Sequence, residues 1–319
     1  MRVFIVFLLL CAQLVEISAK EIKLLTLNVL NSVEHGGWNE YNWSKSDGRT
    51  RGQKVVEVIL KSEADIVCIQ EYIHNNEWIK DELERTTGED WYIRILPRNC
   101  AIVSKYPIPP HGNMFLTPVL ISEKSHINVI SSHQFVYTYL PYAINNGKTA
   151  KEACEDAVRL NHTGYWNAMI EEITVACKKG EIVILAGDFN EPSHVDYSAK
   201  AMKLGLVESD QLSGLMSNVL LDTLKMKDVW IEKRLKENAD ECTLRGITWS
   251  PTTWDYKEGI DDHRIDFIYY TPKYCTFVDA KLVGEIPVVN IVGDKVDLQV
   301  EGWPSDHRGV LAILNVDLK

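Results

Sequence analysis

The sequence lacks the segments that would divide the chain or hold it in a membrane. No internal repeat, low-complexity tract or Pro/Gly/Ser-rich linker interrupts residues 20–319, so we interpret this part as one α/β domain. No segment after residue 19 has the roughly 20 consecutive apolar residues that a membrane-spanning helix needs. These absences predict a soluble, globular protein.

The short motifs of several common enzyme and metal classes are also missing. There is no C-x-x-C or H-x-x-x-H spacing, which argues against a structural zinc site, and no G-x-S-x-G, which argues against a serine-hydrolase nucleophile. Gly147-Lys148-Thr149 matches the end of a phosphate-binding P-loop, but Tyr142 stands where the first glycine of that loop belongs. The chemistry of the chain must therefore be sought in residues that are spread along it.

Positive charge is scarce. The chain has 34 Lys and Arg against 45 Asp and Glu, a net charge of −11 and a pI near 5.4. This balance argues against a broad basic surface that binds nucleic acid through many phosphates. It does not exclude a nuclease, because bound divalent cations offset carboxylate charge within a site.

Residues 1–19 have the pattern of a secretory signal peptide. Arg2 supplies the positive start, an apolar run follows from Phe4 to Leu10, and Ile17-Ser18-Ala19 is a suitable cleavage site. Bulky Leu10 before Cys11 argues against a lipoprotein signal, which needs a small residue there. The segment predicts a secreted, extracellular protein.

Cysteine content and two glycosylation triplets also suit export. An even number of cysteines in residues 20–319 predicts up to three disulfides among 15 possible pairings, although Cys68 fits a buried thiol equally well. N-x-S/T triplets begin at Asn42 and Asn161 and predict a glycoprotein. The six cysteines are Cys68, Cys100, Cys154, Cys177, Cys242 and Cys275.

Short runs rich in β-branched residues predict strands that alternate with helices. A helix is expected over residues 51–62, and an apolar stripe with helical spacing extends from Val158 through His162 to Cys177. Residues 207–262 are less regular and are interpreted as a large insertion. The expected strands cover residues 22–29, 66–69, 91–96, 101–104, 127–131, 182–186, 265–270 and 310–316.

Polar residues stand where these apolar strands begin or end. Any one of them is explained by turn capping, but Asp266 lies inside an apolar strand, where a charge without a partner is costly. Together they supply hard oxygen donors and imidazoles at corresponding strand ends, which suits phosphoryl chemistry on Mg²⁺ or Mn²⁺. The set is Asn28, Glu71, His133, Asp188, Asn190, Asp266, Asp306 and His307.

Most of these residues stand in five short motifs. With these motifs in this order, the sequence resembles the endonuclease/exonuclease/phosphatase (deoxyribonuclease I-like) superfamily. The resemblance spans about residues 22–317. It implies a four-layer α/β sandwich, in which two mixed β-sheets pack face to face with helices outside and the catalytic groups lie at one rim. The motifs are Thr26-Leu27-Asn28, Ile69-Gln70-Glu71, Gly187-Asp188-Phe189-Asn190, Ile265-Asp266-Phe267 and Ser305-Asp306-His307.

The resemblance implies a metal site. Glu71 would be the principal ligand of Mg²⁺ or Mn²⁺, assisted by Asn28 and Asp306. The metal would act as a Lewis acid on a non-bridging phosphate oxygen and offset the charge of the transition state.

It also implies the catalytic groups. Asp188 would orient or deprotonate the attacking water, and Asn190 would hydrogen-bond the phosphate. His307, held by Asp266, and His133 would hydrogen-bond the phosphoryl oxygens as negative charge builds.

The implied activity is phosphodiester hydrolysis, with nucleic acid as the first expected substrate. His35, Trp38 and Tyr142 are the candidate substrate-binding residues, although packing or loop roles explain them as well. Aromatic rings near the catalytic segments can stack on bases. The rings considered are those of Trp38, Trp43, Tyr72, Tyr142, Trp254 and Trp303.

Two alternatives stay open. A phospholipid, as in a sphingomyelinase-like enzyme, or a small molecule is the second class of substrate, although no exposed apolar hairpin is evident and residues 212–224 fit a helix packed on the core. A non-catalytic binding protein of the same fold would be expected to lack Glu71, Asp188 or His307, and all three are present. No specific protein partner is predicted.

Overall fold

The computed structural model describes residues 19–30, 50–73, 77–110, 112–249, 262–285 and 291–318. Several predictions concern residues outside these ranges and are not addressed by the structure. They concern residues 1–18 of the signal peptide, the triplet at Asn42, and the side chains of His35, Trp38, Trp43 and Trp254.

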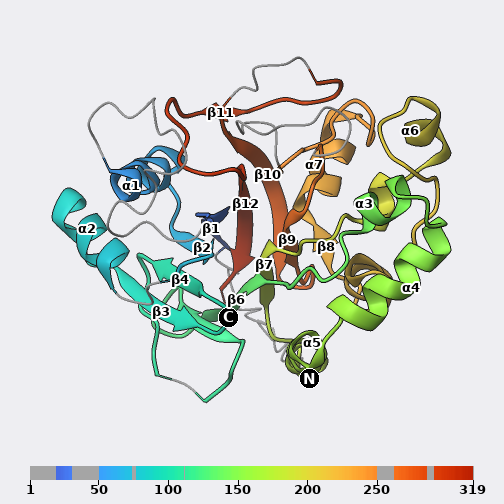
Figure 1. Ribbon diagram of the computed structural model, residues 1–319. Helices are drawn as coiled ribbons and strands as arrows, with labels where there is room; N and C mark the ends of the chain where they lie inside the picture. The colour runs from blue at the N-terminus through green and yellow to red at the C-terminus, as the bar shows by residue number, and fades with distance from the viewer. Residues whose placement is uncertain are drawn as a thin grey trace, which may run out of the picture.

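Two mixed β-sheets form the centre of the molecule (Figure 1). The larger sheet contains β1 (Ala19–Asn28), β2 (Ile66–Gln70), β3 (Tyr92–Leu96), β4 (Cys100–Ser104), β10 (Cys275–Gly284), β11 (Leu298–Gln299) and β12 (Gly309–Asp317). The smaller sheet contains β5 (Thr117–Leu120), β6 (His126–His133), β7 (Val183–Asp188), β8 (Lys227–Asp228) and β9 (Asp266–Tyr270). Their strand orders are β11-β10-β12-β1-β2-β4-β3 and β5-β6-β7-β9-β8.

Helices cover the outer faces of both sheets. Figure 1 shows α1 (Arg51–Ser62) and α2 (Trp78–Thr87) on the left of the sheets, and most of the other helices on the right. The others are α3 (Leu140–Asn145), α4 (Ala150–Asn161), α5 (Gly164–Lys179), α6 (Ala199–Lys203), α7 (Val229–Glu237), a 3₁₀ turn η1 (His194–Asp196) and a π-helical turn η2 (Asn218–Thr223).

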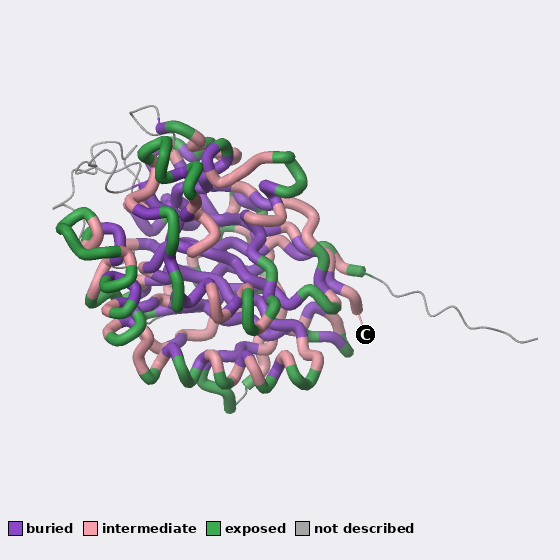
Figure 2. The backbone as a smooth tube through the Cα atoms, turned by 90° about the vertical axis from the view of Figure 1, so that its right-hand side faces the viewer, coloured by how far each residue is buried: buried purple, intermediate pink, exposed green. Residues whose placement is uncertain are grey.

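Alternation of side chains along the strands explains the layers, because successive residues of a strand point to opposite faces. In β1, Leu24 lies in the core between the sheets together with Ile184 of β7, whereas its neighbour Leu25 packs on the outer side with α1 and α2. The outer face of the smaller sheet packs on α5, where Trp166 belongs to the same cluster as Leu185. Figure 2 shows these buried segments in the centre and the exposed residues around them. The predicted four-layer α/β sandwich is confirmed.

All eight predicted strands and the helix over 51–62 are confirmed, with boundary differences of a few residues. The long strand β10 was missed because Asp279 and Lys281 interrupt its apolar pattern and its pairing with β12 shifts between Phe277 and Asp279. Strand β5 was missed because it is a four-residue edge strand that contains Pro118.

Three expectations about helices need correction. The apolar stripe from Val158 to Cys177 is not one helix, because α4 ends at Asn161 and Thr163 adopts an extended backbone before α5 begins. Residues 207–262 are not only an insertion, since α7 lies there and its Trp230 joins the core between the sheets. Residues 212–224 pack on the core as expected, through buried Leu215 and Leu220. They do not form one helix, since the structure has the π-helical turn η2 only over Asn218–Thr223.

The expected disulfides are absent, since all six cysteines of residues 20–319 are free. Cys68 and Cys100 belong to the core between the sheets on adjacent strands, but Cys68 stands opposite Ile102 rather than opposite Cys100. Burial raises the pKa of Cys68 well above the usual range and that of Cys100 to about 12, which makes both thiols unreactive. The alternative interpretation of Cys68 as a buried apolar residue is the correct one.

Asn161 does not suit glycosylation in the folded protein. It is 2% exposed, its Oδ1 accepts hydrogen bonds from the backbone N–H groups of Tyr137 and Thr138, and its Nδ2 donates to the carbonyl oxygen of Thr138. A glycan would not fit on Nδ2 at this buried position and would disturb its bond to Thr138, so the triplet at Asn161 is structural.

Within the described ranges, no helix has the length and apolar character needed to cross a membrane.

Candidate active site

Four polar residues meet where strands of the two sheets end at the same rim. Strands β1 and β2 are parallel, and so are β6 and β7, so the carboxyl ends of each pair lie at the same edge of their sheet. Asn28 ends β1, and Glu71 follows β2. His133 ends β6 and Asp188 ends β7, as direct register partners. Face-to-face packing of the sheets then brings these ends together.

Asn28 joins the two sheets. Its Nδ2 donates to Oε1 of Glu71 at 3.1 Å and to Oδ2 of Asp188, in the other sheet, at 3.0 Å. Its Oδ1 accepts a hydrogen bond from the backbone N–H of Leu30 at 2.8 Å. The role of Asn28 as a metal ligand stays a prediction, because it requires the amide to turn so that its oxygen faces the site.

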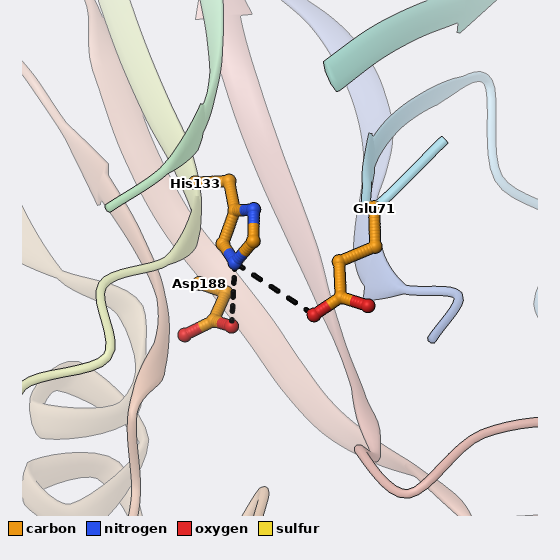
Figure 3. A group of neighbouring side chains, drawn as sticks. All are labelled: Glu71, His133 and Asp188. Atoms are coloured by element: carbon orange, nitrogen blue, oxygen red, sulfur yellow. Dashed lines mark ion pairs between the residues drawn. The ribbon is translucent and has the colours of Figure 1, made fainter. Parts of the chain in front are cut away.

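Glu71, His133 and Asp188 surround one point (Figure 3). Nε2 of His133 lies 3.8 Å from Oε1 of Glu71 and 3.7 Å from Oδ2 of Asp188. One ligand atom from each residue lies within 4.8 Å of the other two, which is close enough for all three to bind one ion. Two carboxylates suit a hard divalent cation.

Asp306 and Arg51 lie beside Glu71. Burial raises the pKa of Asp306, and the charge of Glu71 raises it further, while His307 opposes the shift. Two carboxylates that repel each other in this way are a fitting place for a divalent cation. The role of Asp306 as a metal ligand stays a prediction.

Arg51 was not predicted as a site residue. A capping box between Thr50 and Gln53 starts α1 and places Arg51 at its first position. Its Nη2 donates to the carbonyl oxygens of Val29 and Leu30, directly after β1. Burial lowers the pKa of Arg51 to about 8, while the charges of Asp306 and Glu71 oppose the shift. Arg51 thus adds a buried cation next to the predicted metal ligands.

His307 and Asp266 form the predicted pair. Nδ1 of His307 lies 2.9 Å from Oδ2 of Asp266, and both side chains are buried. Nε2 of His307 points toward Asp188, at 3.9 Å from its Oδ2. Burial alone would lower the pKa of His307, but Asp266, Asp306 and Asp188 together raise it well above the usual histidine range. These carboxylates therefore favour the imidazolium form of His307.

Asp188 lies at the centre of the site and is 1% exposed. Burial raises its pKa to about 6, Asp266 adds to the shift, and His307 and His133 oppose it. The backbone N–H of Asn190 donates to Oδ1 of Asp188 at 2.8 Å, and the side-chain amide of Asn190 lies 3.3 Å from Nε2 of His133. A carboxyl with this pKa is suited to take up a proton near neutral pH.

Local backbone features hold these groups in place. Gly187 has a φ of +152°, and a Cβ there would lie 1.9 Å from the carbonyl oxygen of Ser132. Only glycine therefore lets β7 approach β6 closely enough to set Asp188 beside His133. Of the eight described non-glycine residues with positive φ, five border this site: Leu30, Glu71, Arg98, Asn99 and Asn190. Strained backbone of this kind concentrates at functional sites.

A buried ion-pair network supports Asp266 from behind. Arg264, two residues before Asp266, donates through Nε to Asp196 at 2.9 Å and through Nη1 to Asp228 at 2.5 Å. Arg234 donates to the same Asp196 at 2.6 Å. Burial by itself would raise the pKa of Asp196, but the two guanidinium groups outweigh it and lower this pKa. The network fixes the start of β9.

Of the three candidate substrate-binding residues, only Tyr142 is described. Its ring is 36% exposed and packs edge-on against Tyr139 at 5.0 Å, and Tyr139 in turn contacts Trp249, whose ring lies 6.4 Å from His307. A row of rings therefore leads from Tyr142 to the site. Trp249, which sequence reasoning missed, is part of it.

Two other aromatic residues cannot stack on a substrate. Tyr72 is 1% exposed and Trp303 is 6% exposed, so both are packing residues. Trp303 donates through Nε1 to the carbonyl oxygen of His307 at 2.6 Å and thereby helps to position the histidine.

The sequence is similar to a known family and to a known protein. A sequence model described as "Endonuclease/Exonuclease/phosphatase family" matches residues 25–307. "Uncharacterized protein F14F9.5" of Caenorhabditis elegans is 24% identical over 320 residues, which cover 91% of this chain and 90% of that protein.

Two solved structures share the fold. One is an endonuclease/exonuclease/phosphatase from Beutenbergia cavernae DSM 12333, with a TM-score of 0.52 and 14% identity, covering 93% of this chain and 72% of that one. The other is an endonuclease/exonuclease/phosphatase family protein from Leptotrichia buccalis C-1013-b, with a TM-score of 0.50 and 14% identity, covering 91% and 98%.

Proposed function

The chain belongs to the endonuclease/exonuclease/phosphatase family, whose members hydrolyse phosphodiesters or phosphate esters, and from this premise we propose that it is a metal-dependent phosphodiester hydrolase. One observation carries the proposal. Glu71 from one sheet and Asp188 from the other meet at the same rim, and Asn28 bonds to both. His307, supported by Asp266, faces the same point.

Glu71 and Asp306, with Asn28, would hold Mg²⁺ or Mn²⁺. The raised pKa of Asp306, to which burial and Glu71 contribute, supports this assignment because a cation relieves the repulsion between the two carboxylates. When bound, the ion would polarise a non-bridging phosphate oxygen and neutralise developing charge. The opposing charge of Arg51 limits the excess of negative charge at the site.

Asp188 takes the proton of the attacking water. Its burial and its pKa of about 6 make it a base that is ionised at neutral pH yet able to accept a proton. The water oxygen forms the new P–O bond while the bond to the leaving alkoxide breaks. The alkoxide takes a proton from solvent, and Asp188 later returns its proton to solvent, so that the products are a phosphomonoester and an alcohol. The side chains of Asn190 and His133, 3.3 Å apart, lie beside Asp188 and hydrogen-bond the phosphoryl oxygens.

His307 stabilises the charge that builds on the phosphoryl group. Nδ1 is engaged by Asp266, so Nε2 is the nitrogen that faces the reacting group. The carboxylates around it favour the protonated ring, because they raise its pKa against the opposing effect of burial. An imidazolium donor held in a buried site needs little reorganisation during the reaction.

Nucleic acid is the first proposed substrate, and a phospholipid or small-molecule phosphodiester is the alternative. One panel separates them: single- and double-stranded DNA, RNA, sphingomyelin and cyclic dinucleotides, each with Mg²⁺ and with EDTA. We expect hydrolysis with Mg²⁺ and none with EDTA. Activity that survives metal removal would refute the metal dependence.

The Glu71→Gln variant tests the metal site. It removes the charge of the principal ligand, so we expect a higher Mg²⁺ requirement and a loss of rate. Glu89→Gln makes the same chemical change at an exposed position and serves as the matched control. An Mg²⁺ dependence of Glu71→Gln equal to that of Glu89→Gln would contradict the assignment.

We also propose that the protein is exported. The N-terminal pattern supports this, whereas the six free cysteines and buried Asn161 provide no support for an oxidised, glycosylated product. N-terminal sequencing of protein secreted by a eukaryotic host should give a chain that starts at Lys20. Retention of an uncleaved chain inside the cells would refute the proposal.

A further inference from the structure

Three consecutive apolar side chains are exposed directly beside the site. Phe135, Val136 and Tyr137 are 49%, 41% and 66% exposed and follow His133 after one residue. Gln134, which lies between His133 and Phe135, is buried. Its carbonyl oxygen accepts a hydrogen bond from the side-chain amide of Asn190 at 3.1 Å. The exposed run is therefore tied to a residue that is proposed to bind the phosphate.

Arg98 packs against this run. The guanidinium of Arg98 lies between two rings, 4.2 Å from the ring centre of Phe135 and 3.7 Å from that of Tyr165. It also donates through Nη2 to Oγ1 of Thr163 at 3.1 Å. Arg98 has a φ of +58°, a strained conformation that the surrounding contacts maintain.

A second anchor fixes the backbone of the run. The buried amide of Asn161 accepts from the backbone N–H groups of Tyr137 and Thr138 at 2.9 and 3.1 Å. The rings of Phe135 and Tyr137 lie 5.9 Å apart. Two exposed rings on an immobilised backbone can bind a flat ligand with little loss of conformational entropy.

The charge next to these rings is positive. Within the described ranges, no carboxylate forms an ion pair with Arg98, whose Nη1 donates to Oε1 of Gln134 at 3.5 Å, although the chain as a whole carries a net charge of −11. An exposed ring beside a guanidinium matches a ligand that presents a flat aromatic group next to a phosphate. A nucleotide unit of a single strand has both.

We propose that Phe135, Tyr137 and Arg98 form a binding platform for single-stranded nucleic acid. A base next to the scissile phosphate stacks on the exposed rings, and Arg98 meets the neighbouring backbone phosphate. The inference rests on the proposed function, because it assigns the substrate class of the same site. Stacking of one base on such rings fits the small size of the platform.

The platform is less suited to a lipid surface. Stable membrane attachment requires two signals, such as a large apolar insertion together with a basic patch. Here the exposed apolar run consists of three residues and the cation is a single arginine that is stacked between rings. A lipid surface is therefore the competing outcome of the test.

The test compares two substrates in Tyr137→Ala and Phe135→Leu variants. One substrate is a single-stranded oligothymidylate, and the other is the same strand with abasic tetrahydrofuran residues around the cleavage point. Loss of one stacking contact should raise KM for the base-bearing strand by roughly 5- to 100-fold. The preference for the base-bearing over the abasic strand should fall by the same factor. Leu235→Ala, equally exposed at 66% on α7, is the control and should leave KM unchanged.

Binding provides an independent measurement. Anisotropy of the labelled oligothymidylate in EDTA should show weaker binding for Tyr137→Ala than for the wild type. Equal effects on base-bearing and abasic strands would overturn the platform. So would variants that lose binding to sphingomyelin–phosphatidylcholine vesicles while keeping the affinity for the oligonucleotide. If the wild type binds the strand through Tyr137 but cleaves no phosphodiester, the proposed function fails and the platform stands.

Discussion

Replacing Asp188 by Asn should change how the stability of the metal-free protein depends on pH. Asp188 is 1% exposed, and burial, with a contribution from Asp266, raises its pKa from 3.8 to about 6 against the opposing charges of His307 and His133. The folded protein thus binds this proton more tightly than the unfolded chain does. Wild-type stability therefore falls as pH rises from about 4 through 6, whereas the Asn variant has no such term.

The magnitude follows from the two pKa values. About two pKa units correspond to a penalty of about 3 kcal/mol for the ionised carboxyl above pH 7. At pH 5, where Asp188 is still largely protonated in the folded protein, the same linkage gives a penalty of about half that size. The amide of Asn also places a donor near the amide of Asn28, which costs free energy, but this cost is the same at both pH values. The stability of Asp188→Asn relative to the wild type should therefore improve by about 1–2 kcal/mol between pH 5 and pH 7.5.

Urea denaturation in EDTA at pH 5 and pH 7.5 measures this difference. Thermal unfolding should show a relative Tm gain of roughly 2–5 °C between the two pH values. Asp210→Asn makes the same change at an exposed position and controls for the general effect of charge. The account of Asp188 as a buried carboxyl with a raised pKa would be refuted in two cases. The difference in free energy of unfolding between variant and wild type could be the same at both pH values, or the variant could become less stable relative to the wild type at pH 7.5.

Three further predictions concern the groups around this carboxyl and one concerns the thiols. Asp266→Asn removes a charge-assisted hydrogen bond to His307, so kcat should fall roughly 10- to 100-fold. The alkaline limb of the pH–rate profile should also move to lower pH, a shift that loss of packing alone would not produce. Asp228→Ala leaves buried Arg264 with one partner fewer and should lower the free energy of unfolding by about 3–5 kcal/mol, measured by urea denaturation. Gly187→Ala should cost at least about 3 kcal/mol, because its Cβ would meet the backbone of β6. In unreduced, denatured protein comprising residues 20–319, six thiols should react with Ellman's reagent. A count below six would show that disulfides have formed.

Residues at the ends of apolar strands could be predicted as a site because the reasoning needs only local pattern. The runs before Asn28 and Glu71 are apolar on both faces, as central strands are, and polar residues that end such strands must gather at one edge. Asp266 was recognisable because a carboxylate in an apolar strand needs a buried partner, and His307 is that partner. These inferences depend on sequence neighbours and on general sheet geometry.

Residues whose role depends on distant contacts could not be predicted. Arg51 reaches the site because α1 begins beside the end of β1. Arg98 lies beside it because the turn between β3 and β4 adjoins the segment after β6. The exposure of Phe135 and Tyr137 could not be predicted either, because apolar residues in a run are expected to be buried in the core.

The errors have a similar origin. An even number of cysteines is a statement about composition, and Cys68 and Cys100 instead fill the core between the sheets. The triplet at Asn161 is a local pattern that cannot reveal a buried amide bonded to Thr138. Apolar periodicity also continued across the break between α4 and α5, because both helices pack on the body of the protein.

The central claim is that one site built from both sheets cleaves phosphodiesters, with Asp188 as the group that takes up the proton. Turnover of bis-p-nitrophenyl phosphate at saturating Mg²⁺ by the wild type and by folded Asp188→Asn tests it most directly. We expect the wild type to turn over and the variant to lose at least about 100-fold in kcat, in the range typical of general-base removal. Equal kcat values for the two proteins would contradict the account.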